Sequence, residues 1–163
     1  MIVVTDTSVV LNLAWLGAAD LLRELFGDAL APDAVKQEFE RLARVELRFK
    51  GLSFPDFIAV AEPLKIPDLL TKNDALDAGE IAALALAVER QIRNILIDEK
   101  AGRVAARALG LIPSGLLGIL VEGKRRGLIR QVLPLLDRLR EGARFRMTEQ
   151  LREEIAGLAG ESA

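Results

Sequence analysis

The sequence contains no cysteine and no histidine, and these two absences restrict its chemistry more than any other feature of its composition. Without cysteine, the chain cannot form a disulfide framework, a zinc–thiolate site or a cysteine nucleophile. Without histidine, it has no imidazole for acid–base catalysis, for a Ser-His-Asp triad or for metal binding. Any chemistry must therefore use carboxylates, hydroxyls, lysine, arginine or a bound ion.

The chain also lacks a strong excess of one charge and a long apolar run. Its 22 basic and 24 acidic residues give a formal net charge of -2, which excludes a uniformly basic nucleic-acid binder but allows a local basic face. No stretch of about 18 or more apolar residues is free of charge, and the N-terminus MIVVTDTS lacks the features of a signal peptide. We therefore expect no membrane span and a cytoplasmic protein.

Short apolar segments alternate with segments of helical periodicity along the 163 residues, of which 51% are hydrophobic and 28% charged. The predicted strands are 2–5, 29–32, 58–63, 93–98 and, as a strand or a turn, 111–115. The predicted helices are 8–17, 18–27, 32–47, 76–91, 99–110, 116–127, 129–142 and 148–160, and 64–73 is left open. This alternation is typical of a parallel sheet with helices on both faces, in which ligands bind at the carboxyl ends of the strands.

Two predicted strands end on a carboxylate, Asp6 after the first and Asp98 after the fourth. Because the carboxyl ends of parallel strands meet at one edge of a sheet, we expect both side chains at the same edge. An ionised carboxylate taken out of water is costly unless something pairs with it. Asp98 taken alone could equally be the cap of the helix that follows it.

Three further acids belong to predicted helices. Glu38 borders the apolar stripe of helix 32–47. Asp77 and Glu80 lie three residues apart and point the same way from the first turn of helix 76–91. Simpler explanations exist for each: Asp77 is an N-cap, Glu80 completes a capping box, and Glu38 is a solvated helix charge.

One physical explanation covers Asp6, Glu38, Glu80 and Asp98 together, namely a hard cation. Clustered carboxylates repel one another strongly in a cleft of low dielectric constant. Mg²⁺ or Mn²⁺ removes that cost and takes its ligands from carboxylates, waters and phosphate oxygens. Such an ion polarises a phosphoryl oxygen and generates a hydroxide nucleophile without histidine, which favours phosphodiester hydrolysis.

Four segments resemble, in the same order, the motifs of the PIN-domain ribonucleases: VVTDTSVVLNLA, APDAVKQEFE, LDAGEIAALALA and NILIDEKAGRVAARALGL. The chain is more specifically similar to a VapC-like subgroup, in which GLLGILVEGKRRGLI and a final helical pair follow the last acid. The resemblance implies an α/β, PIN-like three-layer fold with a short central parallel sheet flanked by helices. It also implies one domain over 1–163, with a catalytic core at about 1–115 and extra C-terminal helices at about 116–160.

The resemblance implies an endoribonuclease dependent on Mg²⁺ or Mn²⁺, often the toxin of a toxin–antitoxin pair. Its partners would be RNA, a small antitoxin protein and a second copy of the chain in a homodimer. The catalytic acids carried over by position are Asp6, Glu38, Glu80 and Asp98. Of these, the implied metal ligands are Asp6, Glu80 and Asp98.

Four supporting residues follow from the same resemblance. Ser8 would position water or Asp6, and Asp77 would stand beside Glu80. Glu99 occupies a position where relatives often carry a second aspartate. Arg103 would contact a substrate phosphate or hold the acid at position 98, although an ordinary helix-surface role explains it equally well.

RNA must be held by cations, and the cluster Lys124, Arg125 and Arg126 is the best candidate for a phosphate-binding edge. Most other basic residues, including Arg144 and Arg146, are explained by solvated surfaces. Aromatic residues make up only 4% of the chain and none is tyrosine, so platforms for stacking bases are scarce. Substrate choice would then depend on shape and backbone contacts.

Other classes fit the sequence less well. A haloacid-dehalogenase-type phosphotransferase would carry a second Asp where this chain has Ser8, and a Rossmann module would need a glycine-rich turn after the first strand. A response-regulator receiver lacks the four acids in this order. The alternative that stays open is a PIN-like module that binds RNA or a partner protein without cutting.

Overall fold

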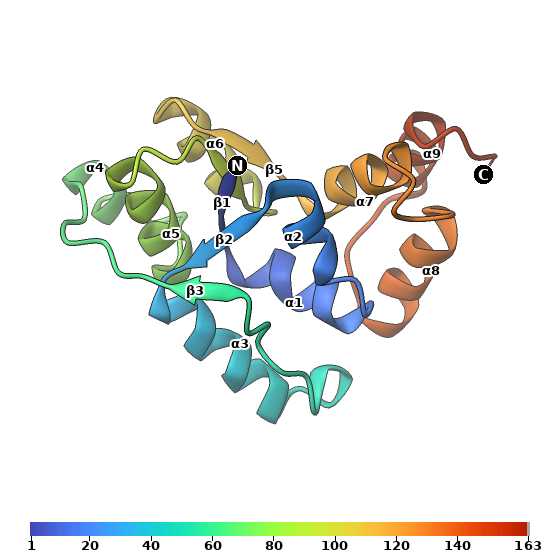
Figure 1. Ribbon diagram of the computed structural model, residues 1–163, viewed down its shortest axis with the longest axis horizontal. Helices are drawn as coiled ribbons and strands as arrows, with labels where there is room; N and C mark the ends of the chain where they lie inside the picture. Colours follow the sequence, from blue (N-terminus) through green and yellow to red (C-terminus); the bar gives the residue numbers. More distant parts are fainter. Residues whose placement is uncertain (163) are drawn as a thin grey trace.

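The structure is a computed structural model, and it describes residues 1–162 (Figure 1). A single parallel sheet lies at its centre, with the strand order β3-β2-β1-β4-β5. Its strands are β1 (Ile2–Thr5), β2 (Asp28–Ala31), β3 (Ile58–Val60), β4 (Asn94–Leu96) and β5 (Ile112–Ser114). All five predicted strands are thus confirmed, the last as a strand and not a turn, although β3 and β4 are shorter than expected.

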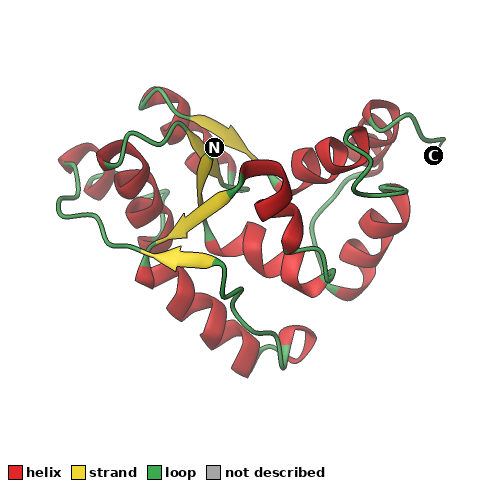
Figure 2. Ribbon diagram, in the orientation of Figure 1, coloured by secondary structure: helices red, strands yellow, loops and turns green. Residues whose placement is uncertain are grey.

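Helices surround this sheet in the described part of the chain (Figure 2). They are α1 (Thr7–Trp15), α2 (Asp20–Phe26), α3 (Asp33–Val45), α4 (Asp68–Thr71), α5 (Ala78–Glu89), α6 (Lys100–Ala108), α7 (Leu116–Arg125), α8 (Leu133–Gly142) and α9 (Glu149–Leu158), with a 3-10 helix η1 (Leu47–Phe49). The open segment 64–73 contains the single turn α4. The α/β, PIN-like fold class predicted from the sequence is confirmed.

The helix predicted over 129–142 was placed too early, because α8 begins only at Leu133. Pro134 lacks a backbone N–H and therefore fits only the first turn of a helix. The apolar periodicity of the preceding residues belongs instead to an irregular segment that packs Val132 into the core.

Two hydrophobic cores cover the two faces of the sheet. Val3 in β1 and Leu96 in β4 point into one core, which they share with α1, α2, α3 and the C-terminal helices. Val4 and Ile95, the neighbouring residues on the same strands, point into the other core beneath α5 and α6. This alternation follows from the period of two along a strand, and it explains why the central strands are apolar throughout.

The C-terminal helices α7, α8 and α9 pack beside α1 and α2 on the first of these cores (Figure 1). Leu116, Ile119 and Leu120 of α7 are fully or almost fully buried there. The helices therefore form one side of the space above the carboxyl ends of β1 and β4. Within the described residues, none of the helices combines the length and apolar character needed to cross a membrane.

Candidate active site

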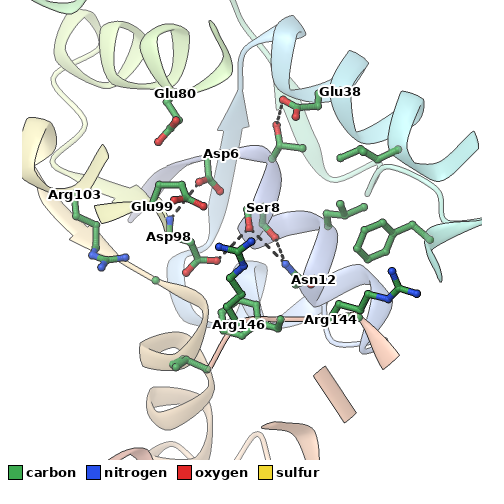
Figure 3. Close-up of a pocket in the computed structure, with 18 of the residues that line it drawn as sticks. Asp6, Ser8, Asn12, Glu38, Glu80, Asp98, Glu99, Arg103, Arg144 and Arg146 are labelled. Carbon is green, nitrogen blue, oxygen red and sulfur yellow. Dashed lines mark hydrogen bonds between the residues drawn. The ribbon is translucent and has the colours of Figure 1, made fainter. Parts of the chain in front are cut away.

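A cleft of about 770 Å³ opens at the carboxyl ends of β1 and β4 (Figure 3). Six carboxylate side chains line it: Asp6, Glu38, Asp77, Glu80, Asp98 and Glu99. They come from strand ends, from α3 and from the start of α5, which lie far apart in the sequence. The parallel order of β1 and β4 brings the two strand-end acids together, as the sequence predicted.

Asp6 connects β1 directly to α1. Its Oδ1 accepts a hydrogen bond from the backbone N–H of Val9 at 2.9 Å, which caps α1, and its Oδ2 accepts one from the N–H of Asp98 at 3.3 Å. Only 3% of the residue is exposed. Burial, reinforced by the negative charge of Asp98, raises the pKa of Asp6 well above its ordinary value.

Asp98 follows β4 and is held from two sides. Its Oδ1 accepts a hydrogen bond from the N–H of Leu116 at 2.8 Å, and its Oδ2 accepts one from the Ser8 hydroxyl at 3.4 Å. Burial raises its pKa, and the Leu116 N–H partly offsets that rise. A Cβ at Gly115 would lie 2.8 Å from Asp98 Oδ1, so a side chain at this position would clash with the carboxylate.

Glu80 has two roles at the start of α5. Its Oε1 accepts a hydrogen bond from the N–H of Asp77 at 3.2 Å, while its own N–H donates to Asp77 Oδ1 at 2.8 Å, which completes a capping box. Its Oε2 is buried and has no hydrogen-bond partner within residues 1–162. Burial, followed by the charge of Asp77, raises the pKa of Glu80 to about 7. The simpler explanation of Asp77 as a cap is thus correct, and it leaves Glu80 Oε2 available for another contact.

Glu38 enters the cleft from α3. Its Oε2 accepts a hydrogen bond from the Thr7 hydroxyl at 3.3 Å. A Cβ at Gly79 would lie 3.6 Å from the same oxygen, so α3 approaches the start of α5 closely here. The contact places Glu38 at the cleft edge formed by α3 and α5.

A family model described as DUF3368, PIN domain, matches residues 2–161. The chain belongs to the PIN-domain family. No curated protein and no solved structure matches the chain. PIN domains are generally nucleases that use divalent metal ions, so family membership indicates a nuclease-type function.

All eight acidic, hydroxyl and supporting residues predicted for the site line the PIN-domain cleft, including Ser8, Glu99 and Arg103. The predicted basic edge, formed by Lys124, Arg125 and Arg126, does not line the cleft. Lys124 is bonded to Glu161 at 2.8 Å, and Arg125 and Arg126 are both bonded to Glu122 at 2.8 Å.

Sequence reasoning missed Asn12, and it explained Arg48, Arg144 and Arg146 as surface residues. Asn12 Nδ2 donates to the backbone carbonyl of Ser8 at 2.9 Å, one helical turn earlier. An i,i+4 spacing of two polar residues on an otherwise apolar helix could have indicated this pair. The three arginines line the cleft of the PIN domain, but nothing in the local sequence shows that they meet there.

The carboxylates of the PIN domain suit a hard cation by their chemistry, because every donor is oxygen. Among residues 1–162, no three of them are arranged to hold one ion at once. Asp6 and Asp98 nevertheless form a pair at adjacent strand ends. Since Mg²⁺ usually takes one or two carboxylates and keeps several other oxygen ligands, this pair fits such an ion.

Proposed function

We propose that the protein is an endoribonuclease dependent on Mg²⁺ or Mn²⁺ that hydrolyses RNA phosphodiester bonds. The observation that carries this proposal is the hydrogen-bonded pair Asp6 and Asp98 at adjacent strand ends, with the unpartnered oxygen of Glu80 in the same cleft. Three carboxylates whose pKa values are raised by burial tend to belong to a functional site.

Asp6 and Asp98 would hold the ion directly. Glu80, whose unpartnered Oε2 lies in the same cleft, would become a third ligand only after its side chain moves, because no three carboxylates are arranged around one point in the described chain. Each of the two aspartates uses backbone N–H groups to fix its orientation, so little reorganisation is needed on binding. A bound Mg²⁺ or Mn²⁺ supplies positive charge that offsets the clustered acids and polarises a phosphoryl oxygen.

The other residues orient these groups and the reactants. The hydroxyl of Ser8 holds Asp98, and Asn12 in turn fixes Ser8. Glu38 has one oxygen occupied by Thr7, and we assign its second oxygen to orienting the attacking water. Arg103 favours the ionised form of Asp98 through its charge and lies where it can meet a substrate phosphate.

The test is cleavage of a mixed pool of structured and single-stranded RNA with Mg²⁺ or Mn²⁺. Wild type should cleave, and EDTA should stop the reaction. Asp6→Asn and Asp98→Asn should each lose more rate than the about 10–100-fold that is typical when a residue that only orients a metal ligand is removed. Asp74→Asn is the matched control, because this exposed acid lies outside the cleft. Equal rates in wild type and in the two cleft variants would refute the proposal.

One observation favours the alternative of a PIN-like module that binds RNA or a protein without cutting. The acids are not arranged as a group of three around one ion within the described chain. RNA binding by wild type without cleavage above the level of Asp98→Asn would support that alternative.

We further propose that the protein acts as the toxin of a toxin–antitoxin pair, is blocked by a small antitoxin and forms a homodimer. The VapC-like order of the motifs supports this proposal, together with exposed apolar residues such as Val104 and Ile112. Growth arrest on expression of wild type but not of Asp6→Asn would support a toxin, and sedimentation would give the oligomeric state.

A further inference from the structure

The cleft has a basic wall that faces its acidic side. Arg144 and Arg146 belong to segment 143–147, which connects α8 to α9 and lines the cleft. Figure 3 shows both on the side opposite Glu80 and Glu38. We infer that Arg144 and Arg146 bind backbone phosphates of a single RNA strand that lies across the acids, an inference that rests on the proposed function.

The backbone of segment 143–147 is anchored, so its arginines project from a fixed wall. Nη1 of Arg48 donates to the carbonyl of Ala143 at 2.6 Å, and the N–H of Phe145 donates to the carbonyl of Leu139 at 3.0 Å. Ala143 is buried, and Phe145 and Met147 pack against the core. The two exposed arginines alternate with these packed residues, and Arg144, Phe145 and Arg146 all line the cleft.

The charges of Arg144 and Arg146 are not used inside the protein. Neither forms an ion pair within residues 1–162, whereas Arg125, Arg126 and Lys124 all do. A carboxylate bonded to a basic side chain offsets part of its charge and so weakens its attraction for a phosphate. The charges of the two arginines of segment 143–147 are not offset in this way, so they are better placed for phosphate binding than the cluster predicted from the sequence.

The backbone of Arg144 adopts a conformation that glycine favours. Its φ of 56° lies in the left-handed region, and glycine has a positive φ after five other described helices, at Gly17, Gly27, Gly110, Gly127 and Gly160. Gln91, after α5 and outside the cleft, is a second non-glycine residue in this conformation, with a φ of 57°. The conformation therefore assigns no function by itself, but it allows Arg144→Gly to remove the side chain without straining the backbone.

The dimensions of the cleft favour one strand over a duplex. Its volume of about 770 Å³ lies in the range of sites for small ligands, and its lining between acids and arginines includes Leu117, Phe145 and Leu151. A single strand can place an unstacked base against such apolar residues, which a paired base cannot do. Phosphates on either side of that base would then lie within reach of the arginines.

The test measures binding apart from cleavage. Anisotropy of a labelled single-stranded RNA is recorded at several salt concentrations, on Asp98→Asn protein to prevent hydrolysis. Adding Arg144→Gln and Arg146→Gln should weaken binding and lower the slope of log K against log salt by about 1.4, since each lost phosphate contact removes about 0.7. The control protein carries Arg90→Gln and Arg93→Gln instead. Both residues precede β4, at the edge of the sheet opposite the cleft, so their substitution should leave the RNA affinity and the salt slope unchanged.

Two results would overturn the inference. One is unchanged affinity in the Arg144→Gln, Arg146→Gln protein, above all if Arg125→Gln with Arg126→Gln weakens binding instead. The other is a lower melting temperature with unchanged RNA affinity, which would mean that the arginines merely neutralise the acids. Cleavage by wild type is scored separately, so a protein that binds but does not cut refutes the proposed function and leaves this inference standing.

Arg144→Gly separates the side chain from the backbone. Because glycine adopts a positive φ readily, this variant should fold with an undiminished melting temperature and still show the reduced affinity of Arg144→Gln. Full affinity in the glycine variant would show that the backbone conformation, and not the guanidinium, is what the site needs.

Discussion

The carboxylate of Asp6 accepts a hydrogen bond of 3.3 Å from the backbone N–H of Asp98, a residue 92 positions later in the chain. The N–H of Asp6 in turn donates to the carbonyl of Leu96 at 2.9 Å. These two bonds lock the end of β1 to the end of β4. They fix both carboxylates in one cleft, where a divalent cation would relieve their repulsion.

A divalent cation should stabilise the protein through Asp6. Mg²⁺ or Mn²⁺ is expected to raise the melting temperature of wild type, by mass action on the native state. Asp6→Asn should lose most of that shift, yet fold normally, because asparagine also caps a helix and carries no charge to bury. Differential scanning fluorimetry with Asp74→Asn as control checks this, and equal shifts in wild type and Asp6→Asn would contradict it.

Without divalent cations, the protein should become less stable as pH rises from about 4.5 to 7. The pKa of Glu80 rises from 4.5 to about 7 on folding, so in this interval the native state binds a proton that the unfolded state does not, and stability falls as pH rises. The raised pKa values of Asp6 and Asp98 act in the same direction.

Glu80→Gln should flatten this pH dependence. Glutamine keeps the capping-box acceptor but cannot ionise, so the variant should gain on the order of 1–3 kcal/mol relative to wild type at pH 8 and little at pH 4.5. Urea unfolding in EDTA at several pH values measures the difference. Parallel stability curves for the two proteins would show that Glu80 keeps its ordinary pKa.

Ser8→Ala should reduce activity more than stability. The substitution removes the hydroxyl that donates to Asp98 Oδ2 at 3.4 Å and leaves the backbone contacts of that carboxylate in place. Residues that orient metal ligands typically contribute about 10–100-fold to metal affinity or rate. Steady-state cleavage and a Mn²⁺ titration would measure the loss, with exposed Ser53→Ala as the matched control. Cleavage by Ser8→Ala at the wild-type rate would show that the Ser8 hydroxyl has no role in the site.

Gly102→Ala should disturb Glu80 from the opposite side. A Cβ at this position in α6 would lie 2.6 Å from Glu80 Oε2 and would also meet the side chain of Ile97. Forcing extra atoms into a packed region costs about 1–3 kcal/mol, and moving the carboxylate should lower the cation-induced shift as well. In Gly157→Ala, where the new Cβ meets nothing within 4 Å, the same change should stabilise α9 by about 0.5–1 kcal/mol. Thermal melts of both variants test the contrast.

The strand-end acids could be predicted because they follow from local rules. An apolar run that ends on a carboxylate, seen at Asp6 and again at Asp98, places that carboxylate at the ligand-binding edge of a parallel sheet. The capping spacing of Asp77 and Glu80 likewise predicted the start of α5 correctly. The lack of histidine and cysteine limits the chemistry to oxygen donors by composition alone.

The basic side of the cleft could not be predicted in this way. Lys124, Arg125 and Arg126 form a conspicuous cluster, but Glu122, one helical turn away, and Glu161, at the far end of the chain, occupy their charges. Arg144 and Arg146 look like isolated surface residues until α7, α8 and α9 pack against α1. A cluster of charged residues can be read from a sequence, but the residues with which it forms ion pairs in the folded protein cannot.

Local patterns thus established the order of strands and helices, the acids at the strand ends and the restriction to oxygen chemistry, because periodicity, capping and composition each act within a few residues. Packing established the rest: the pairing of β1 with β4, the unpartnered oxygen of Glu80 and the basic wall of Arg144 and Arg146. Those features depend on contacts between residues tens of positions apart, and such contacts exist only once the two cores have formed on either side of the sheet.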